Sequence, residues 1–195
     1  MAIPTARPTV PSTATASPTL TPGSVRVDLP ADWQGIEVTE AGFTAAIKAA
    51  NAANPTLAKM LQQVFDAKTY TQYLDYAVYL PGGKVAGAMT IVRMAESGMS
   101  VSTINRDLEK QLTALGATDL TIHAGTVHGR AAQIAQYLLK VTGASGESGT
   151  FAGRTYFVGT NAGALYALSI TCFGANAKQC LAEGDDIGYS LLIGE

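Results

Sequence analysis

Residues 156–173, YFVGTNAGALYALSITCF, decide the fold, because two runs of alternating character are joined there by Asn161-Ala162-Gly163. A short segment with Asn and Gly between two such runs predicts a hairpin. Its strands are expected at Tyr156–Thr160 and Leu165–Phe173. Strands joined by a short turn run antiparallel, so this stretch predicts an antiparallel sheet.

Five further runs with the alternation of a strand precede this hairpin. The first has Val and Leu alternating with polar residues; Pro30 ends it, and Trp33 is expected in the turn that follows. The segment Pro81-Gly82-Gly83 predicts a turn between two of the others. The predicted strands are Ser24–Leu29, Tyr73–Leu80, Lys84–Met94, Asp119–Ala124 and Ala132–Thr142.

Helical periodicity predicts four helices, one beginning near Phe43 and one after Asn54-Pro55, because Asn is a good N-cap and Pro suits the first helical position. A third is expected at about Val101–Leu115. The fourth covers roughly Ala177–Leu192, where Gly184 and Gly188 are expected to weaken it. The predicted fold class is therefore α+β, an antiparallel β-sheet flanked by helices.

The N-terminal residues 1–23 differ in composition from the rest of the chain. They hold five of the eight prolines, are rich in Thr, and carry a single charge, Arg7. Such a segment favours extended conformations and would reach roughly 70 Å at about 3.1 Å per residue. It is interpreted as a disordered stalk that holds a domain away from a membrane or cell wall, with an ordinary disordered tail as the alternative. Residues 24–195 are expected to form one domain.

Cys172 and Cys180 are the only two cysteines. Cys172 ends a predicted strand and Cys180 starts the last predicted helix, and the seven residues between them could bring the two within bonding distance. Three interpretations stay open: a disulfide, two free buried thiols, and metal or redox chemistry. A disulfide would agree with export, because such bonds persist in oxidising compartments.

Charge and hydropathy exclude several classes of protein. The formal net charge is -2 with a pI near 5.7, and no cluster of Lys or Arg provides a track for nucleic acid or a polybasic membrane patch. No run of about 18 apolar residues would span a bilayer. The N-terminus Met1–Pro4 carries no export signal, so we expect a signal ending in a lipidated Cys to have been removed ahead of Ala2.

Catalytic machinery is not visible in the sequence. The two histidines, His123 and His128, are not near a Ser or Cys with an orienting carboxylate, and their spacing is weak for a metal pair. Gly143–Thr150, GASGESGT, lacks the Lys of a phosphate loop and is interpreted as a strand connection. The acidic pairs, interpreted as solvated surface, are Glu37 with Glu40 and Asp185 with Asp186. No catalytic residue, metal site or cofactor is predicted.

Several short motifs resemble the PsbP-like superfamily over about residues 24–193. Val27–Trp33, VDLPADW, is similar to its opening strand, Pro and Trp, and Thr126–Ala131 is similar to the entry to its central strands. Ile187–Ser190 resembles the end of its final helix. Asn54–Leu57 is similar to the Asn-Pro-x-Leu helix that follows the Trp in bacterial lipoproteins of unknown function, the members that the chain resembles most. The resemblance implies an antiparallel sheet between helical layers and no catalytic residues; the two-helix insertion departs from the plant and Ran-binding members.

These observations together predict a non-enzymatic binding or accessory module outside the cell membrane, attached through a lipid anchor. Its partner is expected to be a protein or a small molecule of unknown identity. Two alternatives stay open: a hydrolase-type enzyme whose site is assembled from distant residues, and a structural subunit of an envelope assembly.

Overall fold

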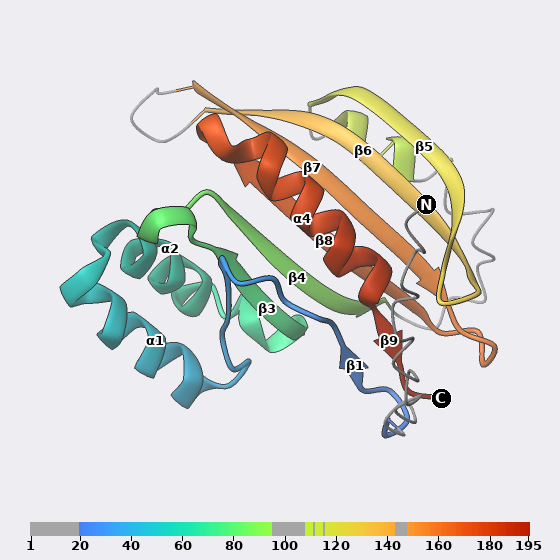
Figure 1. Ribbon diagram of the computed structural model, residues 1–195, viewed down its shortest axis with the longest axis horizontal. Coiled ribbons are helices and arrows are strands. Elements are labelled where there is room, and N and C mark those ends of the chain that lie inside the picture. Colours follow the sequence, from blue (N-terminus) through green and yellow to red (C-terminus); the bar gives the residue numbers. More distant parts are fainter. Residues whose placement is uncertain (1–19, 95–107, 111, 115, 143–147) are drawn as a thin grey trace, which may run out of the picture.

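The computed structural model describes residues 20–94, 108–110, 112–114, 116–142 and 148–195, and its centre is a seven-stranded antiparallel sheet (Figure 1). The strand order is β2-β3-β4-β8-β7-β6-β5. This confirms the predicted α+β class. The strands are β2 Trp33–Gly35, β3 Tyr73–Tyr79, β4 Gly87–Met94, β5 Ala117–Val127, β6 Arg130–Thr142, β7 Ser148–Gly159 and β8 Leu165–Phe173.

The predicted hairpin forms the centre of this sheet. Gly159 of β7 pairs with Leu165 of β8, and the turn is closed by a hydrogen bond from the amide of Thr160 to the carbonyl of Ala164. Gly163 in this turn has φ +82°, a left-handed conformation that glycine adopts without strain. The Asn-Ala-Gly signal therefore located the turn correctly.

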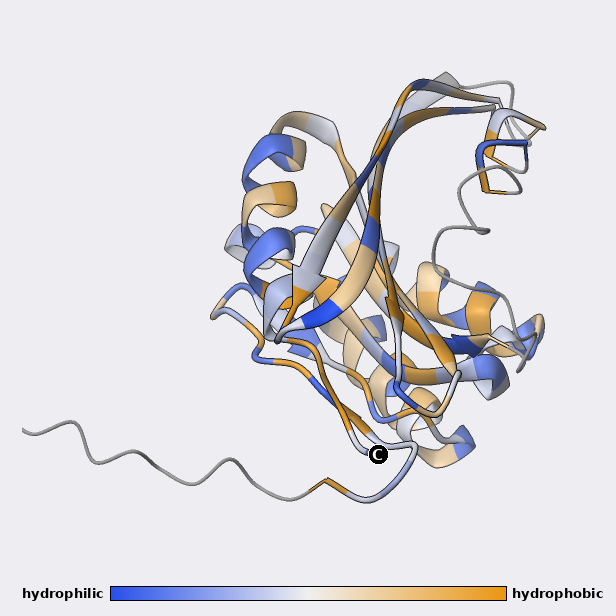
Figure 2. Cartoon of the chain, turned by 90° about the vertical axis from the view of Figure 1, so that its right-hand side faces the viewer, coloured by the Kyte–Doolittle hydropathy of each residue, from blue (hydrophilic) through white to orange (hydrophobic). Residues whose placement is uncertain are grey.

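Helices cover both faces of the sheet (Figures 1 and 2). α1 (Glu40–Ala53) and α2 (Pro55–Asp66) pack on one face, where they share an apolar cluster with Tyr76 and Val78 of β3. α4 (Ala177–Ser190) packs on the other face, against a cluster that includes the alternate residues Ala77 and Tyr79. Because neighbouring strand residues point to opposite faces, β3 is buried from both sides.

The boundary between α1 and α2 is fixed by Asn54, as the sequence predicts. Its Oδ1 accepts a hydrogen bond from the amide of Leu57 at 3.1 Å, which caps the first turn of α2, and Pro55 occupies the first helical position. The Nδ2 group donates to the carbonyl of Gly83 at 2.7 Å and so ties the helix to the β3–β4 turn.

Gly184 and Gly188 have a role that the sequence did not reveal, since they let α4 approach the sheet closely. A Cβ atom at Gly184 would lie 2.7 Å from Cγ2 of Ile170, and one at Gly188 would overlap the ring of Tyr156. Both glycines are buried, with Cys180 and Ile187 on the same face of the helix. The expectation that they merely weaken the helix was therefore incomplete.

Several predicted boundaries were wrong because pairing partners far along the chain decide them. The predicted strand Ser24–Leu29 is reduced to β1, Val25–Arg26, which pairs with β9, Leu192–Ile193. The last predicted helix, Ala177–Leu192, ends at Ser190, and its final residue belongs to β9. Trp33 lies in edge strand β2 and not in a turn. Part of the predicted connection Gly143–Thr150 belongs to β7, while its residues 143–147 lie outside the described residues.

Two further predictions reach beyond the described residues. Of the helix predicted at Val101–Leu115, residues 108–110 and 112–114 are helical and the others are not described. The proposed stalk is described only from Leu20 onward, so that its disorder stays a prediction. In the described parts of the chain, no helix is both long and apolar enough to cross a membrane.

Candidate functional site

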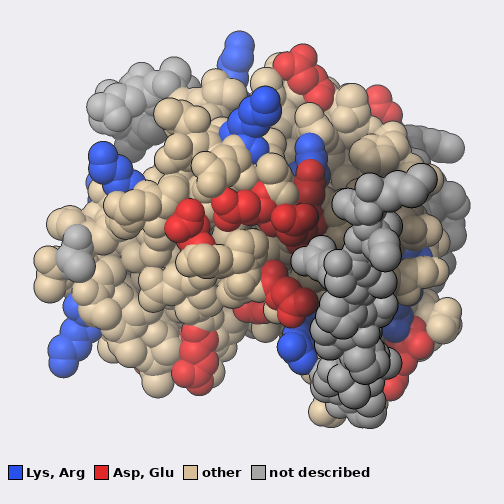
Figure 3. Space-filling model, in the orientation of Figure 1, with Lys and Arg blue, Asp and Glu red and all other residues tan. Residues whose placement is uncertain are grey.

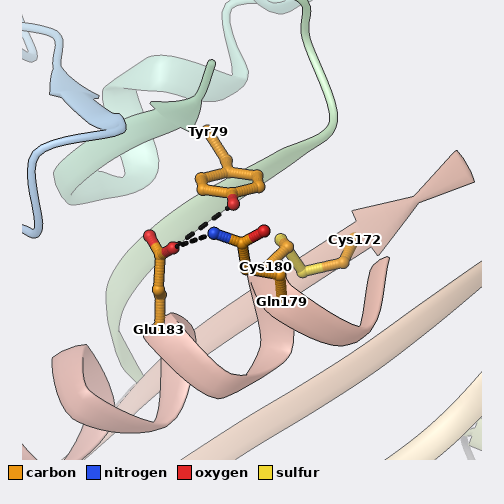
Figure 4. The surroundings of a disulfide bond; sticks show 5 residues. All are labelled: Tyr79, Cys172, Gln179, Cys180 and Glu183. Atoms are coloured by element: carbon orange, nitrogen blue, oxygen red, sulfur yellow. Dashed lines mark hydrogen bonds between the residues drawn. A yellow bond between two sulfur atoms is a disulfide. The ribbon is translucent and has the colours of Figure 1, made fainter. Parts of the chain in front are cut away.

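Cys172 and Cys180 form a disulfide that joins the end of β8 to the first turns of α4 (Figure 4). The two Cα atoms are 5.9 Å apart, and both side chains are fully buried. A Cβ atom at Gly87 of β4 would lie 2.8 Å from the carbonyl oxygen of Thr171 and would also crowd Cys180. The bond is therefore packed into the core and holds the N-terminal half of α4 against the sheet.

A polar group lies beside the disulfide (Figure 4). The Tyr79 hydroxyl donates to Oε1 of Glu183 at 3.3 Å, and Nε2 of Gln179 donates to the same oxygen at 3.0 Å. Burial and the nearby Glu183 carboxylate raise the pKa of Tyr79. Because both sulfurs are bonded to each other, neither is a free thiol. The polar group orients α4 over β3.

The two histidines are not brought together. His123 lies in the middle of β5, opposite Ile134, whereas His128 lies in the β5–β6 turn with φ 47°. Within the described residues, neither imidazole is hydrogen-bonded to a Ser or an Asp. No group of three or more His, Cys, Asp or Glu side chains in this part of the chain could hold a metal ion.

Only one member of the predicted acidic pairs is part of a network. Asp185 accepts hydrogen bonds from the Tyr156 hydroxyl at 2.5 Å and from Arg154, with which it also forms a salt bridge. The Arg154 guanidinium donates in addition to Oε1 of Gln136 at 2.6 Å. Burial and the bond to Asp185 raise the pKa of Tyr156. The network holds α4 against β6 and β7. Asp186, the residue after Asp185, is exposed.

The other acidic pair, Glu37 and Glu40, is exposed as expected, and Glu40 lies in the first turn of α1. Figure 3 shows acidic side chains gathered near the middle of the face that carries α4, with basic side chains mainly around them. α4 contributes Glu183, Asp185 and Asp186. This face is therefore electrostatically negative at its centre, which does not suit a polyanion.

A small apolar pocket is the feature of the described residues that best suits binding. It lies between α1, α2 and the end of the sheet formed by β2 and β3, and its volume is about 270 Å³. Its apolar floor is buried, whereas Ala49 and Gln34 at its mouth are exposed. The lining consists of Gln34, Ile36, Ala46, Ala49, Ala50, Asn54, Leu57, Leu61, Leu80 and Gly83.

The walls of this pocket are held rigidly. Asn54 fixes the junction of the two helices through its bonds to Leu57 and Gly83, all of which line the pocket. Leu61 is fully buried beneath it. The small Ala side chains of α1 leave the space open, because a larger residue at these positions would fill it. The pocket is thus preformed, with an apolar interior and polar groups at the rim.

Helical periodicity places four of the lining residues, Ala46, Ala50, Leu57 and Leu61, on the apolar faces of the two helices, but it does not reveal the opening. Leu57 and Leu61 are core residues as expected, but they also line the pocket. The available signal was the recurrence of Ala on α1, at Ala46, Ala49 and Ala50. Whether these Ala side chains form a pocket depends on which residues lie opposite them across the interface between the helices and the sheet.

Comparison with known proteins supports the fold. LpqN, a protein involved in cell envelope biogenesis of Mycobacterium tuberculosis, has a solved structure that is similar with a TM-score of 0.51 and 12% sequence identity, covering 90% of this chain and 87% of that chain. A Pseudomonas aeruginosa protein of unknown function, PA94, is similar at 16% identity and a TM-score of 0.41, covering 54% of this chain and 72% of that chain.

No family model matches the chain, and no curated protein matches it. The PsbP-like resemblance therefore stays a prediction, and at 12% identity the likeness to LpqN concerns the fold alone. What the comparisons establish is that this chain resembles LpqN in its overall fold.

Proposed function

We propose that the protein is an extracytoplasmic accessory module, tethered to a membrane, that binds a partner protein by taking one of its apolar side chains into the α1/α2 pocket. The pocket is the observation that carries this proposal. An apolar cavity of about 150 Å³ holds a benzene molecule, and drug-sized ligands occupy roughly 300–1,000 Å³. A volume of about 270 Å³ lies between the two and suits one large side chain.

The extracytoplasmic location is supported by other features. The buried disulfide between Cys172 and Cys180 requires oxidation during folding, as occurs outside the cytoplasm. The Thr/Pro-rich composition of residues 1–23 is typical of a spacer. The fold is similar to that of LpqN, a protein involved in cell envelope biogenesis.

Binding is tested with indole, a probe of the size of a Trp side chain, added to the full chain. The amide signals of Asn54 and Leu57 should shift in a saturable manner in heteronuclear NMR spectra. Substituting Ala49→Phe at the mouth should abolish the shifts. The matched control is Ala45→Phe, an exposed position on the same helix that does not line the pocket, and it should bind as the unsubstituted protein does.

Equal indole binding by the two Phe variants, or no saturable shift around the pocket in the unsubstituted protein, would refute the proposal. The location has its own test. Maleimide labelling of the denatured protein from its native host should modify Cys172 and Cys180 only after reduction. Labelling without reductant would contradict an extracytoplasmic location.

A further inference from the structure

A second cluster, away from the α1/α2 pocket, surrounds the side chain of Glu195. Its Oε1 accepts hydrogen bonds from Nη1 of Arg130 at 2.5 Å and from the backbone amide of Asn161 at 3.0 Å. Its Oε2 accepts from Nδ2 of Asn161 at 3.2 Å. Three donors, one from the start of β6 and two from the β7–β8 turn, thus converge on the two oxygens of one carboxylate.

The sheet positions the backbone of both donor residues, and a second hydrogen bond positions the guanidinium of Arg130. Arg130 is the first residue of β6 and pairs with Val127 across the β5–β6 turn. Its Nη2 donates to the carbonyl of Ile193 at 3.2 Å, and this bond fixes the plane of the guanidinium. Asn161 lies in the β7–β8 turn, two residues after Gly159, the last residue of β7. The donor set would therefore persist if Glu195 moved away.

The site is matched to a negative charge. The amide of Asn161 and the Arg130 guanidinium lower the pKa of Glu195 below its ordinary value. A guanidinium and a backbone amide on one carboxylate form the charge-assisted bonds that are strongest among protein hydrogen bonds.

The site is also reachable. The side chains of Arg130 and Glu195 are 24% and 34% exposed. A cavity of about 450 Å³, lined by Arg130, Asn161, His128 and other residues of the two turns, adjoins the donors. A second cavity of about 210 Å³ is lined in part by Glu195 itself. A ligand of moderate size would therefore fit beside the donors when Glu195 withdraws.

We propose that Arg130 and Asn161 form a carboxylate-binding site that Glu195 occupies as an internal ligand. A ligand with a carboxylate group binds by displacing Glu195 into solvent, and the 450 Å³ cavity accepts the remainder of the ligand. The ligand is either a small carboxylic acid or an acidic side chain of a peptide. Glu195 thereby sets the threshold concentration for binding, because every ligand competes with a tethered carboxylate.

The test is a titration of the full chain with N-acetylglutamate, followed by the NMR shift of the Asn161 backbone amide. Glu195→Ala should bind with a dissociation constant at least about tenfold lower than the unsubstituted protein, a difference of about 1.4 kcal/mol. N-acetylglutaminamide, in which amides replace both carboxylates of N-acetylglutamate, should not bind. A parallel titration with the peptide acetyl-Gly-Glu-Gly-amide separates the two sources: tighter binding of the peptide indicates an acidic protein partner, and tighter binding of N-acetylglutamate a small acid.

Two control variants complete the design. Asp186→Ala removes one exposed negative charge elsewhere and should leave the affinity unchanged. Arg130→Gln combined with Glu195→Ala should abolish binding. Glu195→Gln keeps hydrogen-bonding capacity and should give an intermediate affinity, which guards against a folding defect in the Ala variant. Equal affinity in Glu195→Ala and the unsubstituted protein, or binding that survives the loss of Arg130, would overturn the proposal.

Discussion

Substitution of Gly188 by Ala tests the close packing of α4 on the sheet. The added Cβ would lie 2.7 Å from Cδ2 of Tyr156 and closer still to two other atoms of the same ring. Tyr156 is fully buried, and its hydroxyl donates to Asp185, so that the ring has no free space into which to tilt. Either α4 moves outward or the hydrogen bond to Asp185 is strained.

The expected magnitude follows from three contributions. Replacing Gly by Ala within a helix stabilises by about 1 kcal/mol. Overpacking a core costs about 1–3 kcal/mol, and loosening a hydrogen bond to a charged group costs about 1.5 kcal/mol more. We therefore expect Gly188→Ala to lower the free energy of unfolding by about 2 kcal/mol, which corresponds to roughly 4–8 °C in the melting temperature for a domain of this size.

Urea unfolding, followed by circular dichroism and by the fluorescence of the single Trp33, measures this change. Ala182→Gly at an exposed position of α4 calibrates helix propensity and should cost about 1 kcal/mol. In a Tyr156→Leu background, which removes the ring, Gly188→Ala should be neutral or stabilising. A Gly188→Ala variant as stable as the unsubstituted protein, or an equal loss in both backgrounds, would refute the close-packing argument.

Three further predictions concern stability. Replacing both Cys172 and Cys180 by Ala should lower the free energy of unfolding by about 2.5 kcal/mol, since the bond closes a short loop, and reduction of the unsubstituted protein should give a similar loss in urea unfolding. Asp185→Ala should lower the free energy of unfolding by about 2 kcal/mol, because it leaves the partly buried Arg154 without its carboxylate partner. Asp186→Ala should change it by less than about 0.5 kcal/mol in the same assay, and equal losses in the two variants would refute the assignment. Burial raises the pKa of Asp75, so its ionisation destabilises the fold as pH rises above about 4. Asp75→Asn should therefore be more stable than the unsubstituted protein at pH 7 but not at pH 3. A gain in stability that persists at pH 3 would contradict the assignment.

The predicted elements that held are those whose determinants lie close together in sequence. The cap formed by Asn54 and Pro55 depends on the next three residues, and the β7–β8 turn depends on Asn161 and Gly163. Both were predicted because a single turn of chain contains the donors, acceptors and backbone freedom that they require.

The candidate sites depend on contacts that no local pattern encodes. Asp185 and Asp186 are adjacent and chemically identical, yet only Asp185 faces Arg154 and Tyr156 across the helix–sheet interface. The Ala residues of α1 form a pocket only because α2 and β2 leave a space opposite them.

The sequence by itself determined the α+β class, the hairpin, the helix junction at Asn54 and the possibility of a bond between Cys172 and Cys180. Only the tertiary structure decided that Trp33 belongs to an edge strand, that Gly188 is a packing contact, and that Glu195 meets Arg130. Hydrophobic periodicity and the residue types of turns depend on a few neighbouring residues, so they can be recognised in the sequence alone. Strand pairing, close packing and ion pairs join residues that lie far apart in the sequence, in some cases by about the length of the domain. The free energy of these contacts depends on which faces of the helices and strands meet.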